Sequence, residues 1–252
     1  MMKRLSAGIA GLAAIAAGHS PTHADPHHWS YSGEGGPSHW ADLDAKNAAC
    51  RAGKVQSPID IRTHDVHGGS LPALVFNYKP TPLHIVDNGH SIQVDVEPGS
   101  FLTIGGKTYQ LVQFHFHHPS EERIDGKAAD MVAHLVHRNS EGALAVVAVM
   151  LNPGKANDMV ETLWSHLPKQ KEHELDFAKL RINPAALLPS NHSYYTYTGS
   201  LTTPPCTEGV RWVVLKSPSS LSKREISTFA ARYPNDARPV QPLNGREILA
   251  TQ

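Results

Sequence analysis

Residues 113–122 read QFHFHHPSEE, and a single phenylalanine separates His115 from His117. Alternate side chains of a β-strand leave the same face, so the two histidines would point together while Phe114 and Phe116 point the other way. With 17 histidines in 252 residues, about one such pair is expected by chance. The stretch therefore predicts a β-strand with one apolar face, and its histidines need independent support before they are assigned a metal.

A third histidine comes from the next predicted strand, residues 130–137, on which His134 shares a face with Val132 and Val136. Residues 118–129 are long enough to connect this strand to the first as an antiparallel neighbour. Three imidazole nitrogens with an open fourth position are the arrangement of a catalytic zinc, which lowers the pKa of its bound water to about 7. His115, His117 and His134 are therefore candidate Zn²⁺ ligands.

The composition indicates an ordinary globular chain, with 23 basic and 23 acidic residues and 40% hydrophobic residues. No extended charge run suggests nucleic acid or a membrane surface as a partner. No repeat, low-complexity tract or linker divides residues 25–252, so we expect one domain there.

The N-terminus, MMKRLSAGIAGLAAIAAGHSPTHAD, has the features of a secretory signal peptide. Lys3 and Arg4 precede an apolar stretch at residues 5–17, and Thr22-x-Ala24 is a plausible cleavage site. We expect residues 1–24 to be removed and residues 25–252 to reach the periplasm, or to be secreted. A buried N-terminal helix is the alternative.

Export would place Cys50 and Cys206, the two cysteines, in an oxidising compartment where they can pair. A bridge would close a loop of 206 − 50 = 156 residues. In the chain-entropy model it would stabilise the fold by about 5 kcal/mol. Two buried free thiols are the alternative.

Most of the chain shows the two-residue period of strands separated by Gly, Pro, Asn and Asp, which predicts a mainly β, largely antiparallel protein. The predicted strands are residues 73–78, 83–86, 91–96, 109–117, 130–137, 144–150 and 210–215. Helices are predicted at residues 222–233, where Ser222 and Glu225 have capping-box spacing, and at residues 157–166.

Seven motifs in the same order make the chain resemble the α-class carbonic anhydrases, and specifically the bacterial periplasmic type. They are HHWSY at 27–31, QSPIDI at 56–61, NGH at 88–90, QFHFHHPSE at 113–121, AHLVH at 133–137, GSLTTPPCTEGVRW at 199–212 and RPVQPLNGR at 238–246. The resemblance spans the whole mature chain. It implies a single α+β domain around a twisted, largely antiparallel ten-stranded sheet with a few short peripheral helices.

The resemblance also implies an activity, the zinc-dependent reversible hydration of CO2 to bicarbonate and a proton by zinc-hydroxide attack. Thr202 would accept the hydroxide proton and pass its own to Glu121, and His90 would shuttle protons to buffer. A histidine suits that task because its unperturbed pKa lies near 7.

Other residues match the family's surroundings of the metal. Thr203 would lie beside the substrate, and an apolar wall for CO2 would consist of Val136, Val146, Leu201 and Trp212. Polar residues would order water near His90 or hold a zinc ligand, and these are Tyr31, Asn88, Gln93 and Gln113.

One position departs from the family pattern. The family has a Glu two residues before the third zinc histidine, where this chain has Val132, and it commonly has a His where this chain has Glu122. Partners that orient metal ligands are worth roughly 10 to 100-fold in affinity or activity. We therefore expect Glu122 to reach His134 from the neighbouring strand.

Two other function classes compete with this assignment. A noncatalytic binding protein of the same fold would typically lack a zinc histidine, and all three are present. A zinc peptidase would be expected to carry H-E-x-x-H, which does not occur. His19, His23, His27 and His28 could bind metal adventitiously, but His19 and His23 should leave with the signal peptide, and a flexible solvated segment is the preferred account. The oligomeric state, monomer or dimer, does not follow from the sequence.

Overall fold

The computed structural model describes residues 28–252. The predicted signal peptide, residues 1–24, and His19, His23 and His27 lie outside the described residues. Within residues 28–252, no helix is both long enough and apolar enough to span a bilayer.

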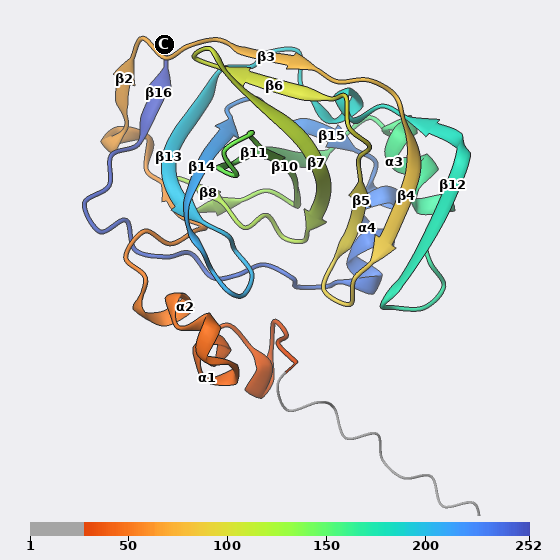
Figure 1. The fold of residues 1–252 in the computed structure, drawn as a ribbon, viewed down its shortest axis with the longest axis horizontal. Helices are drawn as coiled ribbons and strands as arrows, with labels where there is room; N and C mark the ends of the chain where they lie inside the picture. The colour runs from red at the N-terminus through yellow and green to blue at the C-terminus, as the bar shows by residue number, and fades with distance from the viewer. Residues whose placement is uncertain (1–27) are drawn as a thin grey trace, which may run out of the picture.

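A large twisted sheet dominates the described chain (Figure 1). Its main path runs, in spatial order, through β12 (His173–Ile182), β4 (Thr81–Asp87), β5 (Ile92–Asp95), β7 (Lys107–His117), β10 (Met131–Arg138), β11 (Leu144–Pro153), β14 (Glu208–Leu215), β13 (Tyr194–Ser200), β16 (Leu249–Thr251) and β2 (His67–Gly69). Beside this path lie β3 (Leu74–Asn77), β6 (Phe101–Ile104) and β15 (Ser219–Leu221). A separate small sheet consists of β1 (Asp60–Ile61), β8 (Arg123–Ile124) and β9 (Lys127–Ala128).

The mainly β, largely antiparallel fold expected from the sequence is confirmed, although the sheet is mixed. Most neighbours are antiparallel, including β7 with β10 and β10 with β11. The pairs β11 with β14, β11 with β15, and β16 with β2 are parallel. Every predicted strand is present, with ends that differ by at most three residues.

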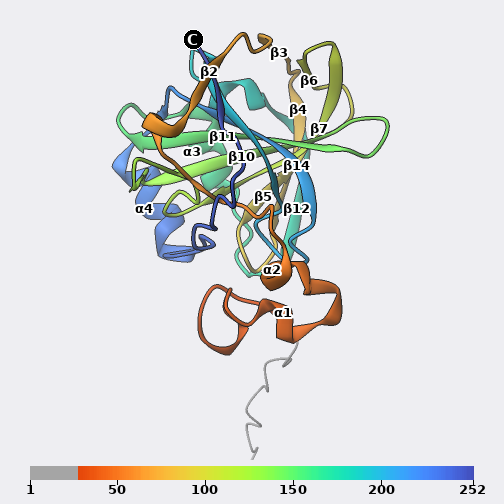
Figure 2. The same ribbon diagram turned by 90° about the vertical axis from the view of Figure 1, so that its left-hand side faces the viewer.

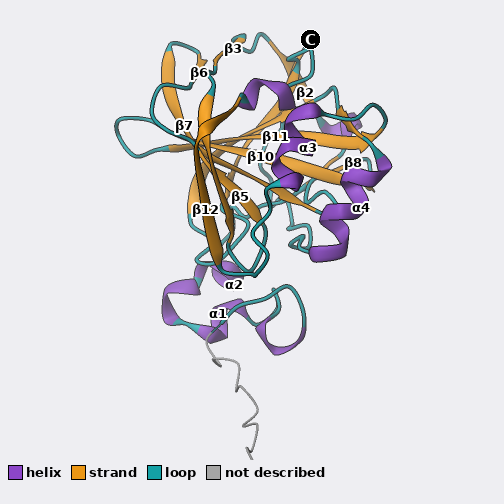
Figure 3. Cartoon of the chain, turned by 90° about the vertical axis from the view of Figure 1, so that its right-hand side faces the viewer, coloured by secondary structure: helices purple, strands orange, loops and turns teal. Residues whose placement is uncertain are grey.

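Helices are short and peripheral among the described residues. The α-helices are α1 (Trp40–Leu43), α2 (Ala49–Ala52), α3 (Asp158–Ser165) and α4 (Lys223–Arg232), and 3-10 turns occur at Gly33–Gly35, Ala45–Asn47, Thr63–Asp65 and Pro184–Leu187. Ser222 and Glu225 form the predicted capping box of α4. Figures 2 and 3 place α3 and α4 together on one side of the sheet and α1 and α2 beyond one end of it.

The two faces of β7 have different neighbours. Phe114 and Phe116 are fully buried in the main core, where the Phe116 ring lies 5.1 Å from Trp164 of α3 and 6.2 Å from Phe229 of α4, between centroids. The opposite face carries His115 and His117, whose rings contact His134, and His134 in turn contacts Trp212 of a second apolar cluster. The alternation FHFH thus separates the core from the histidine site.

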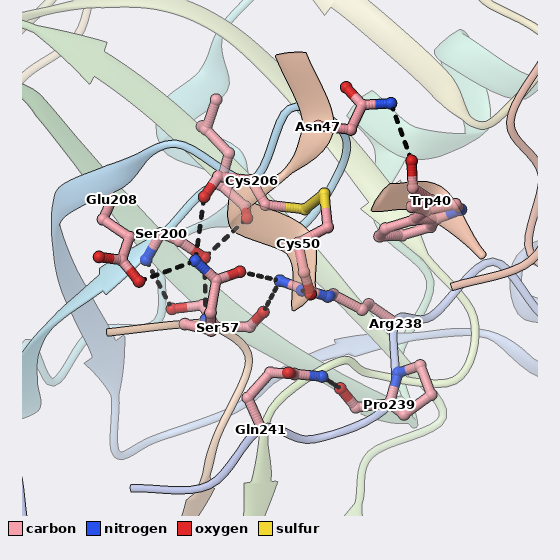
Figure 4. The surroundings of a disulfide bond; sticks show 12 residues. Trp40, Asn47, Cys50, Ser57, Ser200, Cys206, Glu208, Arg238, Pro239 and Gln241 are labelled. Carbon is pink, nitrogen blue, oxygen red and sulfur yellow. Dashed lines mark hydrogen bonds between the residues drawn. A yellow bond between two sulfur atoms is a disulfide. The ribbon is translucent and has the colours of Figure 1, made fainter. Parts of the chain in front are cut away.

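The Cys50–Cys206 disulfide joins α2 to the loop between β13 and β14 (Figure 4). The predicted pairing is therefore present. The bridge packs in a third small cluster with the fully buried Trp40 and with Trp29 and Tyr31. Through it, the N-terminal helices are fastened to the loop that carries Thr202 and Thr203.

Candidate metal centre

Strand register brings the three candidate histidines together. His115 of β7 lies directly opposite His134 of β10, and His117 lies two residues further along β7 on the same face. One nitrogen from each ring lies within 4.8 Å of the others. His117 and His134 are each 1% exposed, whereas His115 is half-buried. The convergence predicted from strand alternation is therefore present in the structure.

Hydrogen bonds fix which nitrogen of His115 and His117 faces the centre. His115 Nδ1 donates to Gln113 Oε1 at 2.8 Å, and His117 Nδ1 donates to the Asp236 backbone oxygen at 2.7 Å. Because both partners are acceptors, each Nδ1 must carry the proton, and each Nε2 keeps its lone pair. The two rings are thus held in the tautomer that can bind a metal through Nε2.

The third ring is held in the opposite tautomer. His134 Nε2 lies 3.1 Å from both carboxylate oxygens of Glu122, which leaves Nδ1 as the inward-facing nitrogen. Glu122 is fully buried in the turn after β7, not on a strand, while Val132 packs in the apolar cluster. The expected contact between Glu122 and His134 is therefore present, although it starts from a turn.

These donors fit a zinc ion. His117 Nε2 is buried without a hydrogen-bond partner among the described residues. An unpaired buried nitrogen of this kind is costly unless a ligand satisfies it. Three neutral imidazoles suit zinc, and the two cysteines are bound to each other and offer no thiolate.

The electrostatics differ between neighbouring rings. Burial, together with His117 and His134, holds the pKa of His115 well below its usual value. Burial also opposes protonation of His117, but the carboxylates of Glu121 and Asp236 outweigh it and raise the pKa of His117. Neighbouring carboxylates therefore favour protonation of His117, whereas His115 is affected mainly by burial and by the other two histidines.

Glu121 lies against the histidine cluster. Its Oε2 is 3.6 Å from His117 Nε2 and 3.8 Å from His134 Nδ1, and its Oε1 accepts the Arg238 backbone N–H at 2.8 Å. Among the described residues Oε2 has no hydrogen-bond partner. Thr202 is buried, but within residues 28–252 no hydrogen bond joins it to Glu121. The expected contact between these two side chains is not made in this structure.

The predicted apolar wall belongs to the cluster beside the histidines. Val146 and Trp212 are buried members, and Val136 and Leu201 pack against them half-buried. The Trp212 ring centroid lies 5.0 Å from that of His134. Thr203 is half-buried on the same loop as Leu201.

His90 lies outside the cluster, in a turn closed by Asn88, whose side chain accepts the His90 backbone N–H at 3.0 Å. Its ring stacks on Trp29 at 3.5 Å and on His28 at 4.9 Å between centroids. Burial, with His28 and Lys171, lowers the pKa of His90 to about 4. This stacked ring is therefore neutral at pH 7.

Two further polar residues were expected near His90. The Tyr31 hydroxyl is buried without a hydrogen-bond partner among the described residues, and Gln93 donates to Asp95 at 2.7 Å. Three further residues contact the site but were not predicted from the sequence: Trp29, Asp236 and Arg238. Trp29 and Arg238 lie within matched motifs, but no local pattern marked what they contact.

Known proteins with similar sequences and structures agree with this geometry. The family model described as eukaryotic-type carbonic anhydrase matches residues 35–252. The α-carbonic anhydrase of Thermovibrio ammonificans, solved with the inhibitor sulfanilamide, superposes with a TM-score of 0.85 at 41% identity, covering 88% of this chain and 98% of that one. This chain belongs to the α-carbonic anhydrase family.

Bacterial members of the α-carbonic anhydrase family match over nearly their whole length. The carbonic anhydrase of Nostoc sp. is 40% identical over 99% of this chain and 96% of its own. That of Pectobacterium carotovorum is 42% identical over 91% of this chain and 93% of its own. Membership makes the chain an enzyme whose small-molecule substrates are CO2 and bicarbonate.

Proposed function

We propose that the protein catalyses the reversible hydration of CO2 with a zinc ion bound by His115, His117 and His134. The observation that carries this proposal is the cluster of three imidazole nitrogens whose outer nitrogens are all engaged by acceptors. When bound, zinc supplies a nucleophilic oxygen near neutral pH by lowering the pKa of a water ligand.

Thr202 and Glu121 would orient the attack. A hydroxyl can donate one hydrogen bond while it accepts another. If Glu121 accepts the Thr202 O–H, the Thr202 oxygen can only accept a hydrogen bond from the attacking oxygen, which aims a lone pair of that oxygen at CO2. The unpartnered Oε2 of Glu121 beside the histidines is available for that bond. Its other oxygen is already held by the Arg238 backbone, which fixes the carboxylate plane.

CO2 is uncharged and apolar, so its binding site should be hydrophobic. The expected wall is one apolar group, made of Val136, Val146, Leu201 and Trp212. Its Trp212 ring lies 5.0 Å from the His134 ring, between centroids. Thr203 would border the same space.

His90 would carry protons between the site and buffer. In the stack with Trp29 its pKa of about 4 disfavours protonation at neutral pH. A ring that swings out of the stack loses most of that burial, and its pKa moves toward 6.5. The shuttle would therefore work through rotation of the His90 side chain, with Tyr31, Asn88 and Gln93 bordering its path.

Residues 1–24 would be a signal peptide and residues 25–252 the catalytic domain, exported to the periplasm. The Cys50–Cys206 bridge supports this, because disulfides persist in oxidising compartments.

Stopped-flow measurement of CO2 hydration by mature protein of known zinc content tests the proposal. We expect turnover proportional to bound zinc and inhibited by sulfanilamide. Zinc-loaded protein without hydration activity would refute the proposed reaction, and protein that binds no zinc would refute the proposed centre.

A further inference from the structure

Residues 236–238, called here the 236–238 strap, bind the turn that follows β7 from two sides. The Asp236 backbone oxygen accepts from His117 Nδ1 at 2.7 Å, and its Oδ1 accepts the His118 N–H at 2.7 Å. The Asp236 N–H donates to the His118 oxygen at 3.1 Å, and the Arg238 N–H donates to Glu121 Oε1 at 2.8 Å. One short segment therefore orients both a zinc ligand and the carboxylate beside it.

The Arg238 side chain fastens this strap to the rest of the protein (Figure 4). Arg238 is 2% exposed. Its Nη1 donates to Gln56 Oε1 at 2.9 Å and to the Ser57 oxygen at 2.7 Å, and its Nη2 donates to the Cys50 oxygen at 3.1 Å. The guanidinium also lies 5.5 Å from the ring centroid of Trp40.

Because it is buried, the Arg238 guanidinium must keep its hydrogen-bond partners. Burial lowers the pKa of Arg238 to about 10, so the group stays charged at neutral pH inside the protein. Its side-chain acceptors are neutral oxygens, and its Nε has no hydrogen-bond partner among the described residues. A buried charge is costly unless it is hydrogen-bonded, so loss of any of these three contacts should be costly. The planar guanidinium has a rigid set of donors, which a lysine does not reproduce.

The same contacts reach the disulfide. Gln56 Nε2 donates to the Cys206 oxygen at 3.0 Å, while Arg238 binds the Cys50 oxygen. Arg238 and Gln56 therefore hold the backbone of both cysteines and each other. The 236–238 strap is thereby connected to α2 and to the loop that carries Thr202.

We propose that Arg238 is a positioning residue of the active site, whose side chain sets the places of Glu121 and of the Asp236 carbonyl that orients His117. The proposal rests on the proposed function, because it assigns a role toward the zinc centre. It also means that the N-terminal region and the disulfide affect the position of site residues through the hydrogen bonds of Gln56 and Arg238.

Arg238→Lys tests the proposal, with Arg246→Lys as its matched control. Arg246 is half-buried in the same C-terminal segment and donates to three backbone oxygens, those of Thr198, Pro242 and Leu243, each at 2.9 Å. Its guanidinium lies 5.8 Å from the Tyr197 ring centroid. In the described structure its hydrogen bonds reach neither the zinc-site histidines nor Glu121.

Zinc affinity, measured by chelator competition, and kcat/KM for CO2 are the two readouts. We expect Arg238→Lys to weaken zinc binding roughly tenfold or more and to lower kcat/KM by a similar factor, as for lost partners of metal ligands. Arg246→Lys should leave both within about twofold of wild type, on the scale of non-site surface changes. Gln56→Ala should also lower zinc affinity and kcat/KM, by less than Arg238→Lys does. It replaces Arg238→Lys as the test if that variant does not fold.

Wild-type zinc affinity and kcat/KM in Arg238→Lys would overturn the proposal, as would equal losses in Arg246→Lys. If Arg238→Lys does not fold, an unchanged Gln56→Ala would also overturn it. Wild-type protein that binds zinc but does not hydrate CO2 would refute the proposed reaction alone, because the comparison of zinc affinities would still test the role of Arg238.

Discussion

His134 Nε2 lies 3.1 Å from both carboxylate oxygens of Glu122, and both side chains are buried. Although burial opposes ionisation, His134 lowers the pKa of Glu122, so the carboxylate is charged at neutral pH. A charged acceptor makes a strong hydrogen bond to the ring N–H. Glu122 thus supplies the hydrogen-bond acceptor for His134 Nε2, which the apolar side chain of Val132, on the same strand as the histidine, cannot supply.

The first prediction concerns this pair. Glu122→Ala should weaken zinc binding by roughly 10 to 100-fold, because the His134 N–H would be buried without its acceptor. Chelator competition measures the change. Adding Val132→Glu to that variant should recover part of the affinity, since Val132 and His134 share a face of β10. Unchanged affinity in Glu122→Ala would show that another acceptor takes over.

The second prediction separates metal binding from chemistry. His117→Ala should lose both zinc and CO2 hydration, because one of three ligands is removed. Thr202→Ala should keep stoichiometric zinc and lower kcat by about 100-fold, the scale of a positioned proton-transfer group. Metal analysis beside stopped-flow rates distinguishes the two. Zinc loss from Thr202→Ala would contradict this division of roles.

A third prediction concerns the disulfide, which closes a loop of 156 residues. The Cys50→Ser, Cys206→Ser double variant should unfold at lower denaturant concentration, with a loss of up to about 5 kcal/mol in the chain-entropy model. Wild-type protein under reducing conditions should behave alike. Mass mapping without reductant that found two free thiols in exported protein would refute the bridge itself.

The metal ligands were predictable because they follow a local rule. The alternation around His115 and His117 and the shared face of His134 both follow from the two-residue strand period. The partner of His117 was not predictable in this way, since Asp236 lies 119 residues away and contributes a backbone oxygen, which any residue could supply. Only the assembled chain brings the two together.

The strands also divide into those that local sequence predicts and those that depend on tertiary pairing. Strands such as β11 were predicted from short runs rich in Val, Leu, Ile and Phe, whereas β12, His173–Ile182, was not predicted. This edge strand exposes charged residues and contains Glu, Ala, Lys and Leu, which also suit a helix. Pairing with β4, rather than its own propensity, decides its conformation.

The fourth prediction is a pH dependence of stability from His137, a buried histidine outside the metal centre. Its Nε2 accepts from the Tyr78 hydroxyl at 2.6 Å and its Nδ1 donates to the Ala145 oxygen at 3.2 Å, so the neutral ring is fully satisfied. Burial lowers the pKa of His137 from 6.5 to about 4. As pH falls below 6.5, the unfolded chain takes up this proton before the folded chain does.

The stability that neutral His137 contributes is therefore complete above about pH 6.5 and is lost progressively as the pH falls toward 4. Between about pH 7 and about pH 5 the loss should be roughly 2 kcal/mol. Urea unfolding of wild type and His137→Asn at both pH values measures it. The variant should be less stable at neutral pH but should lack this share of the pH dependence. An equal fall in the free energy of unfolding of both proteins between the two pH values would contradict the assignment.

The last prediction concerns His90 as proton shuttle. A water of pKa about 7 can lose protons directly to solvent at only about 10³ s⁻¹, whereas fast zinc hydration approaches 10⁶ s⁻¹. A relay is therefore needed at high turnover, and His90 can serve only when its ring leaves the stack with Trp29, where its pKa is about 4. His90→Ala should lower kcat in dilute buffer, leave kcat/KM for CO2 unchanged and recover in concentrated imidazole. His192→Ala, a change in a half-buried histidine that contacts Phe76, is the control and should alter none of these. Wild-type kcat for His90→Ala in dilute buffer would mean that protons leave by another route.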